Sequence, residues 1–495
     1  MGVTTTDSTA NGNIATGNTA AFDITAQGKA RPDRVDAKLM ITVVALAALT
    51  FLGVLSETSL NIAYSDLMRE FSITASTVQW LTTGYLLLLA IAIPSSPFLV
   101  RKFATKTLFL AAIAVFTVGT LLGAFAFSFP MLLAARLVMA VGTGVSMPLL
   151  TTIVLERAPL RQRGMLLGVV AMVTSVAPAL GPVYGGMVVE YLNWHWIFYI
   201  MVPFLVVAAV MGVMTIPDIR KGEEAYISVP SLLLVAVGLA CVIVACSFCG
   251  SWPPAMLAGV AALAVVCLGA FAAMQLRTDR PLLNVRVFAH PGFSIGVVVL
   301  MLMQATVLGI NFLLPILLQR GLGRSSMVSA LILLPGAVCG AVMSMIVGRL
   351  LRVHRATALL LIGIPGVLVL ELVLLAVPQY WWAVMIAYML LMPVAGFVQV
   401  PAQTHSLNQL PERLNADGSA ALNTLQQLAG AIGTAIASTL MDGFASSAIA
   451  SGADQATAYV SSFSSGMVAF VVALAVALAL AFLLRRLERS ASARG

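Results

Sequence analysis

Charged side chains are scarce in this chain of 495 residues. Asp, Glu, Lys and Arg make up only 9% of it, whereas hydrophobic residues make up 60%. A soluble globular domain carries about 25% charged residues, so a chain this apolar has too few polar groups to cover a surface exposed to water. Lipid must therefore be the solvent for much of the molecule. The sequence predicts an all-α integral membrane protein.

Signatures of catalysis and of metal or nucleotide binding are also missing. The few cysteines (Cys241, Cys246, Cys249, Cys267 and Cys339) lie in apolar runs without a His cluster, which predicts packing residues rather than metal ligands. The sequence has no grouping of nucleophile, base and acid and no G-x-x-x-x-G-K-[ST] loop. We therefore expect no enzyme, no metal and no cofactor. Any solute movement by such a chain would have to draw its energy from an ion or solute gradient rather than from bound nucleotide.

The apolar residues fall into runs long enough to cross a bilayer, which takes about 20 residues of helix. Fourteen spans are predicted, at 39–64, 78–98, 107–127, 131–154, 164–188, 196–216, 228–249, 254–274, 293–317, 326–350, 357–377, 382–405, 418–440 and 461–485. The run at 418–440 is the weakest because Asn423, Gln426 and Gln427 lie on it. An interfacial helix there would leave thirteen spans, but an even number places both basic termini on one side.

The net charge of +8 is explained by membrane topology rather than by a nucleic-acid partner. If the N-terminus is cytoplasmic, the tails, loops and span ends on that side hold every Lys and Arg except Arg69, Arg320 and Arg324, with Arg136 inside a span. Such a bias is the positive-inside rule. The sequence predicts a multi-pass protein of the inner (cytoplasmic) membrane, with both termini cytoplasmic and no nucleic-acid partner.

The spans divide into two six-helix bundles and a two-helix insert, a 6+2+6 arrangement. Basic loops follow the second and tenth spans, which hold equivalent positions in the two bundles, as expected of the internal repeats of secondary transporters. The predicted segments are a disordered cytoplasmic tail at 1–38, an N-terminal bundle at 39–216, an insert with flanking loops at 217–291, a C-terminal bundle at 292–486 and a cytoplasmic tail at 487–495. A site is expected between the bundles near mid-membrane.

Three charged residues lie inside predicted spans away from the span ends, where each charge costs on the order of 3 kcal/mol or more. Glu57 is predicted to carry a proton, because hydrocarbon favours the neutral form of a carboxyl group; the alternative is a structural acid near the outer mouth. Arg136 is either a fixed charge that modulates proton exchange or half of a structural ion pair. Glu371 is a second proton site, a substrate counter-ion or a lumen-facing acid without a role.

Amide and aromatic side chains within the spans are candidates for substrate contact. These residues are Asn61, Gln79, Trp80, Tyr85, Gln304 and Asn311. Trp80 and Tyr85 can stack on a ring, although aromatic residues near a span end are more often interface anchors. An apolar site with scattered amides suits a small amphipathic compound.

The fifth span carries prolines among small residues, including Gly181, Pro182, Gly185 and Gly186. Proline removes a helix hydrogen bond, and small residues let a neighbouring backbone come close. This pattern predicts a pliable helix at the interface between the bundles; ordinary close packing is the alternative.

Several of these segments match motifs of one transporter family. Thr58, Asn61 and Ala63 match the first-span pattern l-D-x-T-i-v-N-v-A-l-P, and the run from Gln79 to Leu87 is similar to q-W-x-x-t-x-Y-x-L. Further matches are Arg136, Gly142 and Gly144 with R-x-x-q-G-x-g-x-g, and Gly181 to Gly186 with the antiporter motif G-P-x-x-G-G. From about residue 39 to 486, their order and spacing resemble the major facilitator superfamily, specifically its fourteen-helix drug:proton antiporters (family 2).

Two departures from the family pattern indicate a branch within it. Ser56 holds the position of the usual first-span Asp, with Glu57 beside it. In the loop after the second span, Arg101 replaces the Asp of G-x-L-a-D-r-x-G-r-k and Ala104 replaces a Gly. These changes resemble the lincomycin-resistance-type branch. They imply an altered cytoplasmic gate around Arg101 and Lys102.

The resemblance implies a proton-coupled antiporter that exports amphipathic drugs or antibiotics by alternating access between its two bundles. It implies a monomer in the lipid bilayer whose partners are the small substrate and protons, with the proton gradient as the energy source. An exporter of an endogenous lipid or metabolite and a solute importer of the same fold remain as alternatives. A membrane sensor or scaffold is less favoured, because no signalling domain is attached.

Overall fold

The computed structural model describes residues 37–157, 160–216, 228–249, 252–278, 281–351, 353, 355–411 and 414–492. Inside helices, the side chains at 96–97, 101, 155–156, 160–165, 167–175, 179, 416 and 488–492 lie outside this description. The predicted tail at 1–38 falls almost wholly outside the described residues, and so does the side chain of Arg101.

The described chain forms helices joined by short turns. The first group comprises α1 (Ala37–Ile62), α2 (Tyr64–Glu70), α3 (Ala75–Val78), α4 (Trp80–Lys102), α5 (Thr105–Ala124), α6 (Phe129–Arg157), α7 (Leu160–Tyr191), α8 (Trp196–Tyr199) and α9 (Met201–Thr215). Then come α10 (Val229–Ser247) and α11 (Pro254–Arg277). The last group comprises the 3₁₀ turn η1 (Val285–Ala289), α12 (Pro291–Ile316), the π-helical turn η2 (Leu317–Gly321), α13 (Ser326–Leu350), α14 (Ala356–Ala376), α15 (Trp381–Asn408), α16 (Asn415–Ala450) and α17 (Gln455–Ser492).

The prediction of fourteen spans is confirmed. Within the described residues, thirteen helical segments are long and apolar enough to cross a membrane. The fourteenth is α7, a 32-residue helix at the place of the fifth predicted span. The weakest predicted span is part of α16, which packs against α12, α17 and α4, with 61% of its most apolar stretch buried. It is therefore a membrane helix and not an interfacial one.

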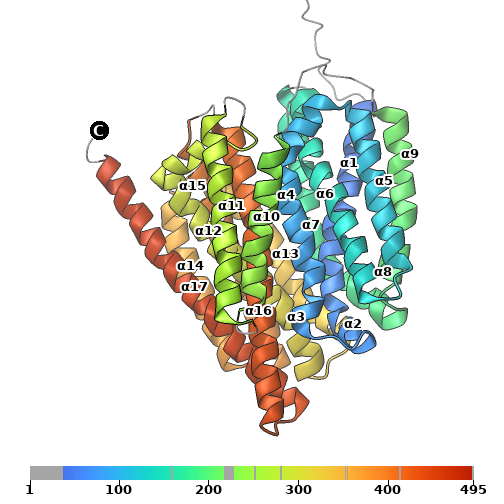
Figure 1. The fold of residues 1–495 in the computed structure, drawn as a ribbon, viewed down its shortest axis with the longest axis vertical. Helices are drawn as coiled ribbons and strands as arrows, with labels where there is room; N and C mark the ends of the chain where they lie inside the picture. Colours follow the sequence, from blue (N-terminus) through green and yellow to red (C-terminus); the bar gives the residue numbers. More distant parts are fainter. Residues whose placement is uncertain are drawn as a thin grey trace, which may run out of the picture.

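The helices form two bundles with a pair of helices beside them (Figure 1). In the N-terminal bundle α1 packs against α6, α7 and α9, and in the C-terminal bundle α12 packs against α15, α16 and α17. Two seams join the bundles, one between α7 and α13 and the other between α4 and α16. α10 packs on α11, α16 and α4. α1 begins and α17 ends at the same, upper end of the view. The domain boundaries drawn from the sequence stay predictions.

Small residues on α7 allow it to touch α1 and α13 at once. A Cβ atom added at Gly181 would overlap Thr58 Oγ1, and one at Gly185 would overlap the carbonyl oxygen of Ser59, both on α1. On the other side, a Cβ atom at Gly186 would lie 2.6 Å from the Cβ atom of Ala330 on α13. The glycines of the antiporter motif therefore hold α7 wedged between its own bundle and the opposite one.

We expect Gly185→Ala to destabilise the folded protein, because the added methyl group meets backbone that cannot move aside cheaply. Overpacking of this kind costs about 1–3 kcal/mol, which corresponds to a loss of at least about 2 °C in melting temperature in detergent. The matched control is Gly269→Ala on α11, where an added Cβ atom has nothing within 4 Å. Equal melting temperatures for the two variants would contradict the packing argument.

Candidate functional site

A cavity of about 390 Å³ lies between the two bundles. Helices α1, α4, α6 and α7 line one side of it, and α12, α13, α15 and α16 line the other. Its polar lining residues are Glu57, Thr58, Asn61, Thr143, Gln304, Asn311, Ser344, Tyr388, Gln399 and Gln427. Most of the remaining lining is aliphatic or Met. A mainly apolar cavity of this size with a few polar groups suits a small amphipathic molecule.

Glu57 is the only charged residue among the described residues that line this cavity. It lies on α1 and is half-buried. The sequence prediction placed this acid inside the membrane, and the structure directs it into the cavity rather than toward lipid. An ionisable group in this place can exchange a proton or attract a cation.

A buried positive charge contacts the residue that precedes this acid. The side chain of Arg136 on α6 is fully buried, and its Nη1 donates a hydrogen bond of 3.0 Å to Ser56 Oγ, one residue before Glu57. Its Nε and Nη2 have no hydrogen-bond partner among the described residues. A buried cation is costly unless an opposite charge compensates it. Glu57, the residue after Ser56, interacts with Arg136 electrostatically, although the two form no direct ion pair among the described contacts.

Tyr85 supports Arg136 instead of lining the cavity. The guanidinium carbon of Arg136 lies 4.2 Å from the centre of the Tyr85 ring, a cation–π contact. The Tyr85 hydroxyl group shares a hydrogen bond of 2.7 Å with Thr143 Oγ1 and donates one of 3.2 Å to the carbonyl oxygen of Gly53. Gly53 has no room for a side chain, because an added Cβ atom would lie 2.5 Å from Thr143 Oγ1.

The structure brings three of the predicted amides into the cavity lining. The side-chain oxygen of Asn61 accepts a hydrogen bond of 3.1 Å from Thr82. The oxygen of Asn311 accepts one of 2.8 Å from the hydroxyl group of Tyr388. Gln304 likewise accepts a hydrogen bond of 3.3 Å, from the Gln399 side chain. These pairs fix the orientation of the amides from both bundles.

Three other predicted residues lie away from the cavity. Gln79 is fully buried and accepts a hydrogen bond from Thr83, which also bonds Thr434 across the α4–α16 seam at 2.8 Å. Trp80 lines a different pocket, formed with α10 and α16. Glu371 is fully buried on α14, outside the described lining, and neither carboxylate oxygen has a hydrogen-bond partner among the described residues.

The loop after α4 is only partly described. Lys102 ends α4 and places its ammonium group 5.2 Å from the centre of the Phe98 ring. The side chain of Arg101 lies outside the described residues. The altered gate inferred for this loop stays a prediction.

Sequence reasoning missed six polar lining residues: Thr58, Thr143, Ser344, Tyr388, Gln399 and Gln427. Gln399 carries the same signal as Gln304, an amide inside an apolar span. Gln427 was interpreted only as a weakness of its span, although the polar group is the part of that helix that faces the cavity. Tyr388 has no local signal, because an isolated Tyr in a span is also typical of packing.

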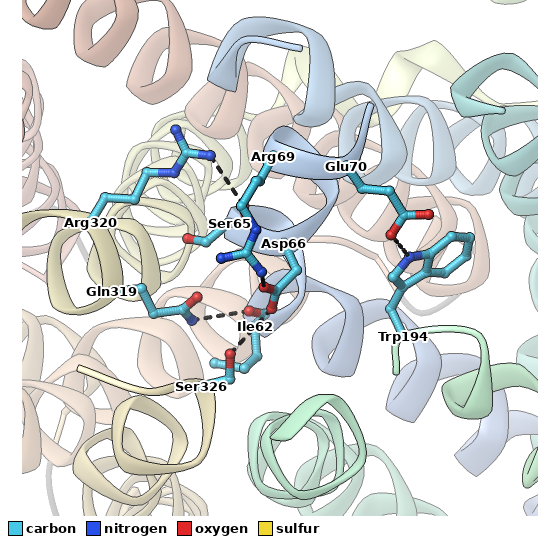
Figure 2. A network of polar contacts seen from close by, with 9 residues as sticks. All are labelled: Ile62, Ser65, Asp66, Arg69, Glu70, Trp194, Gln319, Arg320 and Ser326. Carbon is cyan, nitrogen blue, oxygen red and sulfur yellow. Dashed lines mark hydrogen bonds and ion pairs between the residues drawn. The ribbon is translucent and has the colours of Figure 1, made fainter. Parts of the chain in front are cut away.

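Hydrogen bonds join the two bundles at the end where α1 ends (Figure 2). Gln319 Nε2, on η2, donates a hydrogen bond of 3.0 Å to the carbonyl oxygen of Ile62. Arg320 Nη2, on the same turn, donates a hydrogen bond of 3.1 Å to the carbonyl oxygen of Ser65. Arg320 Nη1 donates another of 3.1 Å to the Tyr459 hydroxyl group. The π-helical turn thus holds the start of α2 from the opposite bundle.

Two carboxylates of the N-terminal bundle meet the start of α13 at the same end. Asp66 Oδ2 accepts a hydrogen bond of 3.4 Å from Ser326 Oγ, and Glu190 accepts one of 3.4 Å from the backbone N–H of Met327. Negative charge at a helix N-terminus is favourable. We call these inter-bundle bonds the clasp; its residues are Ile62, Ser65, Asp66, Glu190, Gln319, Arg320, Ser326 and Met327.

The clasp rests on a braced α2 (Figure 2). Arg69 forms an ion pair with Asp66 one turn away, and Glu70 accepts a hydrogen bond of 2.7 Å from Trp194 Nε1. The side chain of Arg69 is 79% exposed, so its ion pair contributes little to stability. The bond to Trp194 is half-buried and ties α2 to the segment between α7 and α8.

Comparison with known proteins identifies the family. The model of the Major Facilitator Superfamily matches residues 46–434. This chain belongs to the major facilitator superfamily. The chain is 38% identical over 413 residues to the lincomycin resistance protein LmrB of Bacillus subtilis, covering 82% of this chain and 86% of that protein. It is 37% identical to the protein of the same name from Listeria innocua, covering 79% and 84% of the two chains.

Solved structures of transporters in this superfamily share the fold. The crystal structure of a bacterial homologue of the human lysosomal transporter Spinster, inward-facing and unoccupied, aligns with a TM-score of 0.63 over 92% of this chain and 98% of that one, at 16% identity. PepTSo, a transporter of the POT family, aligns with a TM-score of 0.65 over 91% and 98%, at 12% identity. At these identities the likeness concerns the fold alone.

We expect Arg320→Met to open the transporter at its clasp end. The variant loses a charge-assisted hydrogen bond between the bundles, worth about 1.5–3 kcal/mol, which shifts the balance of two conformations by at least about tenfold. The reporter is a single cysteine introduced at the cavity position Ala337 (Ala337→Cys) in a chain without other cysteines. The measurement is the rate at which this cysteine reacts with an impermeant maleimide added on the clasp side of the membrane.

The control for this variant is Arg324→Met. Arg324 stacks 5.5 Å from the centre of the Trp381 ring within its own bundle, so its loss should leave the labelling rate unchanged. Equal rates for both variants would show that the clasp does not hold the bundles together.

Proposed function

We propose that this transporter exports amphipathic drug-type compounds across the cytoplasmic membrane in exchange for protons, with Glu57 as the proton-carrying group. The observation that carries the proposal is the position of Glu57 as the single described charge in a cavity between the bundles. The names of the Bacillus and Listeria relatives, both lincomycin resistance proteins, support an antibiotic as substrate. The cavity is built from one chain, so a monomer suffices.

The proposed topology places the chain termini in the cytoplasm. The clasp then lies at the outer face, and the structure represents the state that is closed to the outside. A substrate would enter the cavity from the cytoplasm or the inner leaflet. It would contact Asn61, Gln304 and Asn311, whose amides are oriented by partners within the protein.

Coupling follows from competition for one carboxylate. Ionised Glu57 compensates the buried charge of Arg136 and attracts a cationic substrate, whereas protonated Glu57 does neither. A proton bound from outside therefore favours substrate release, and loss of the proton to the cytoplasm restores the binding site. Because both ligands shift the same equilibrium between two conformations, an inward proton gradient drives outward substrate movement.

Other residues have proposed roles around this exchange. Gly181 and Gly185 would hold α7 against α1, Pro182 would face the cavity, and Gly186 would form the contact at which α7 moves against α13. Arg101 and Lys102 would act at the cytoplasmic gate. Glu371 is proposed as a second proton site, since a buried carboxyl group without a partner is most stable in its neutral form.

We expect Glu57→Gln to abolish proton-coupled efflux while the protein still inserts and folds. Gln keeps the volume and polarity of the side chain but can neither release a proton nor compensate Arg136. In proteoliposomes with an imposed pH gradient and lincomycin as the probe, the variant should lose at least about 90% of its gradient-driven flux. Asp454→Asn, which removes a carboxylate from an exposed turn, is the control that should keep full flux.

Two results would reject this proposal. Full gradient-driven flux in Glu57→Gln would remove Glu57 from coupling. Accumulation of the probe on the cytoplasmic side of oriented vesicles, driven by the same gradient, would indicate an importer of the same fold.

A further inference from the structure

A second cavity, of about 920 Å³, lies at the clasp end, where α3, α10 and α16 meet in the lower part of Figure 1. We call it the seam pocket, because its lining comes from the N-terminal bundle, the two-helix insert and the C-terminal bundle. Its lining residues are Thr74, Ser76, Thr77, Trp80, Ser247, Phe248, Cys249, Trp252, Thr439, Leu440, Asp442, Gly443, Phe444, Ser446 and Ser447. None of them lines the central cavity.

Aromatic rings from two parts of the chain line the seam pocket. Phe248 and Trp252 come from the end of α10 and the turn that follows, with ring centres 4.4 Å apart and planes 12° apart. Trp80, at the start of α4, supplies the third ring. All three side chains are half-buried, so part of each ring is accessible. Faces of Trp and Phe rings attract organic cations.

Asp442 is the only charged residue among the described residues of this pocket. Its Oδ1 accepts a hydrogen bond of 3.0 Å from the backbone N–H of Ala75, and its Oδ2 accepts one from the backbone N–H of Ser76. These bonds fix the carboxylate across the seam between the bundles. Each oxygen of an ionised carboxylate keeps a further lone pair, so the group can still accept from a ligand.

One polar atom at the pocket has no partner within the described protein. Ser247 is 5% exposed, and its Oγ has no hydrogen-bond partner among the described residues. The backbone carbonyl oxygen of the same residue accepts a hydrogen bond of 2.9 Å from Thr439 Oγ1. A buried hydroxyl group without a partner costs free energy that a bound polar ligand would offset. It lies in the same lining as the carboxylate and the three rings.

We propose that the seam pocket binds the ammonium or phosphonium group of an amphipathic organic cation, with Asp442 and the rings of Trp80, Phe248 and Trp252 as the recognition elements. The pocket offers one negative charge and no described positive one, and its aromatic faces suit a cation too large to be strongly hydrated. Choline-type lipid headgroups and free cationic amphiphiles share this chemistry.

Occupancy of the seam pocket favours one conformation of the transporter. The lining residues of α4, α10 and α16 are in place only while the two bundles meet at this end. A ligand that contacts all three helices therefore stabilises the clasped state. The site is thus regulatory and separate from the exchange of substrate and proton at Glu57.

Cys249 provides a direct test, because it is exposed and lines the pocket. In a full-length chain with Cys241, Cys246, Cys267 and Cys339 replaced by Ser, Cys249 is the only thiol. We expect tetraphenylphosphonium to slow its reaction with an impermeant maleimide. Tetraphenylborate, which has nearly the same shape and the opposite charge, should not. Equal protection by the two ions would overturn the proposal.

Three variants assign the protection to the pocket. Asp442→Asn and Trp252→Ala should each raise the half-protecting concentration of tetraphenylphosphonium by about tenfold, while Trp252→Phe should keep it within about threefold. Because Asp442 also holds α3, the Trp252 pair keeps the test valid if Asp442→Asn folds poorly. Unchanged protection in Trp252→Ala would overturn the proposal.

Glu57→Gln separates this site from the central cavity. It should abolish exchange yet leave the protection of Cys249 unchanged; protection that disappears with Glu57 would place the cation in the central cavity and overturn the proposal.

Nanodiscs of phosphatidylcholine and of phosphatidylglycerol distinguish a lipid headgroup from a free amphiphile as the source of the bound cation. Slower labelling in phosphatidylcholine without added cation identifies a lipid headgroup, and equal labelling identifies a free amphiphile as the ligand.

Discussion

The charge of Arg136, enclosed in the N-terminal bundle, is the constraint on which this transporter depends. It is fully buried, donates a hydrogen bond to Ser56 and lies over the ring of Tyr85. Such an arrangement is costly without a compensating negative charge, and Glu57 in the central cavity is the carboxylate that interacts electrostatically with Arg136. The protonation of Glu57 therefore changes the electrostatic energy of the whole bundle, because no second carboxylate of the described cavity lining can substitute.

The contacts of α1 connect this charge to the junction between the bundles. Glu57 is followed by Thr58 and Ser59, which meet the glycines of α7, and α7 meets α13 of the opposite bundle at Gly186. A few residues further, the carbonyl oxygen of Ile62 accepts a hydrogen bond from Gln319. The glycine contacts leave no space for independent adjustment, so a movement of α1 must be accommodated at both α7 and the clasp.

Much of the architecture was predictable because hydropathy alone marks membrane helices. The span count and the intramembrane position of Glu57 follow from it, and the motifs add the family. Which face of a helix meets the cavity was not predictable, because each of these helices carries apolar residues on all sides and the sequence therefore marks no face. Tyr85 and Trp80 were therefore assigned to the cavity although they face Arg136 and the seam pocket. The clasp left no signal either, because two of its acceptors are backbone carbonyl groups.

The central claim is that substrate and proton compete for Glu57. Calorimetric titration of the purified transporter with a cationic substrate, in buffers of different ionisation enthalpy at one pH, measures protons released on binding. The account predicts a net release of about half a proton per substrate when Glu57 is half-protonated, which rises toward about one proton as pH falls further and is absent in Glu57→Gln. Binding by the wild-type chain with no proton release at any pH, or equal release by the variant, would contradict it.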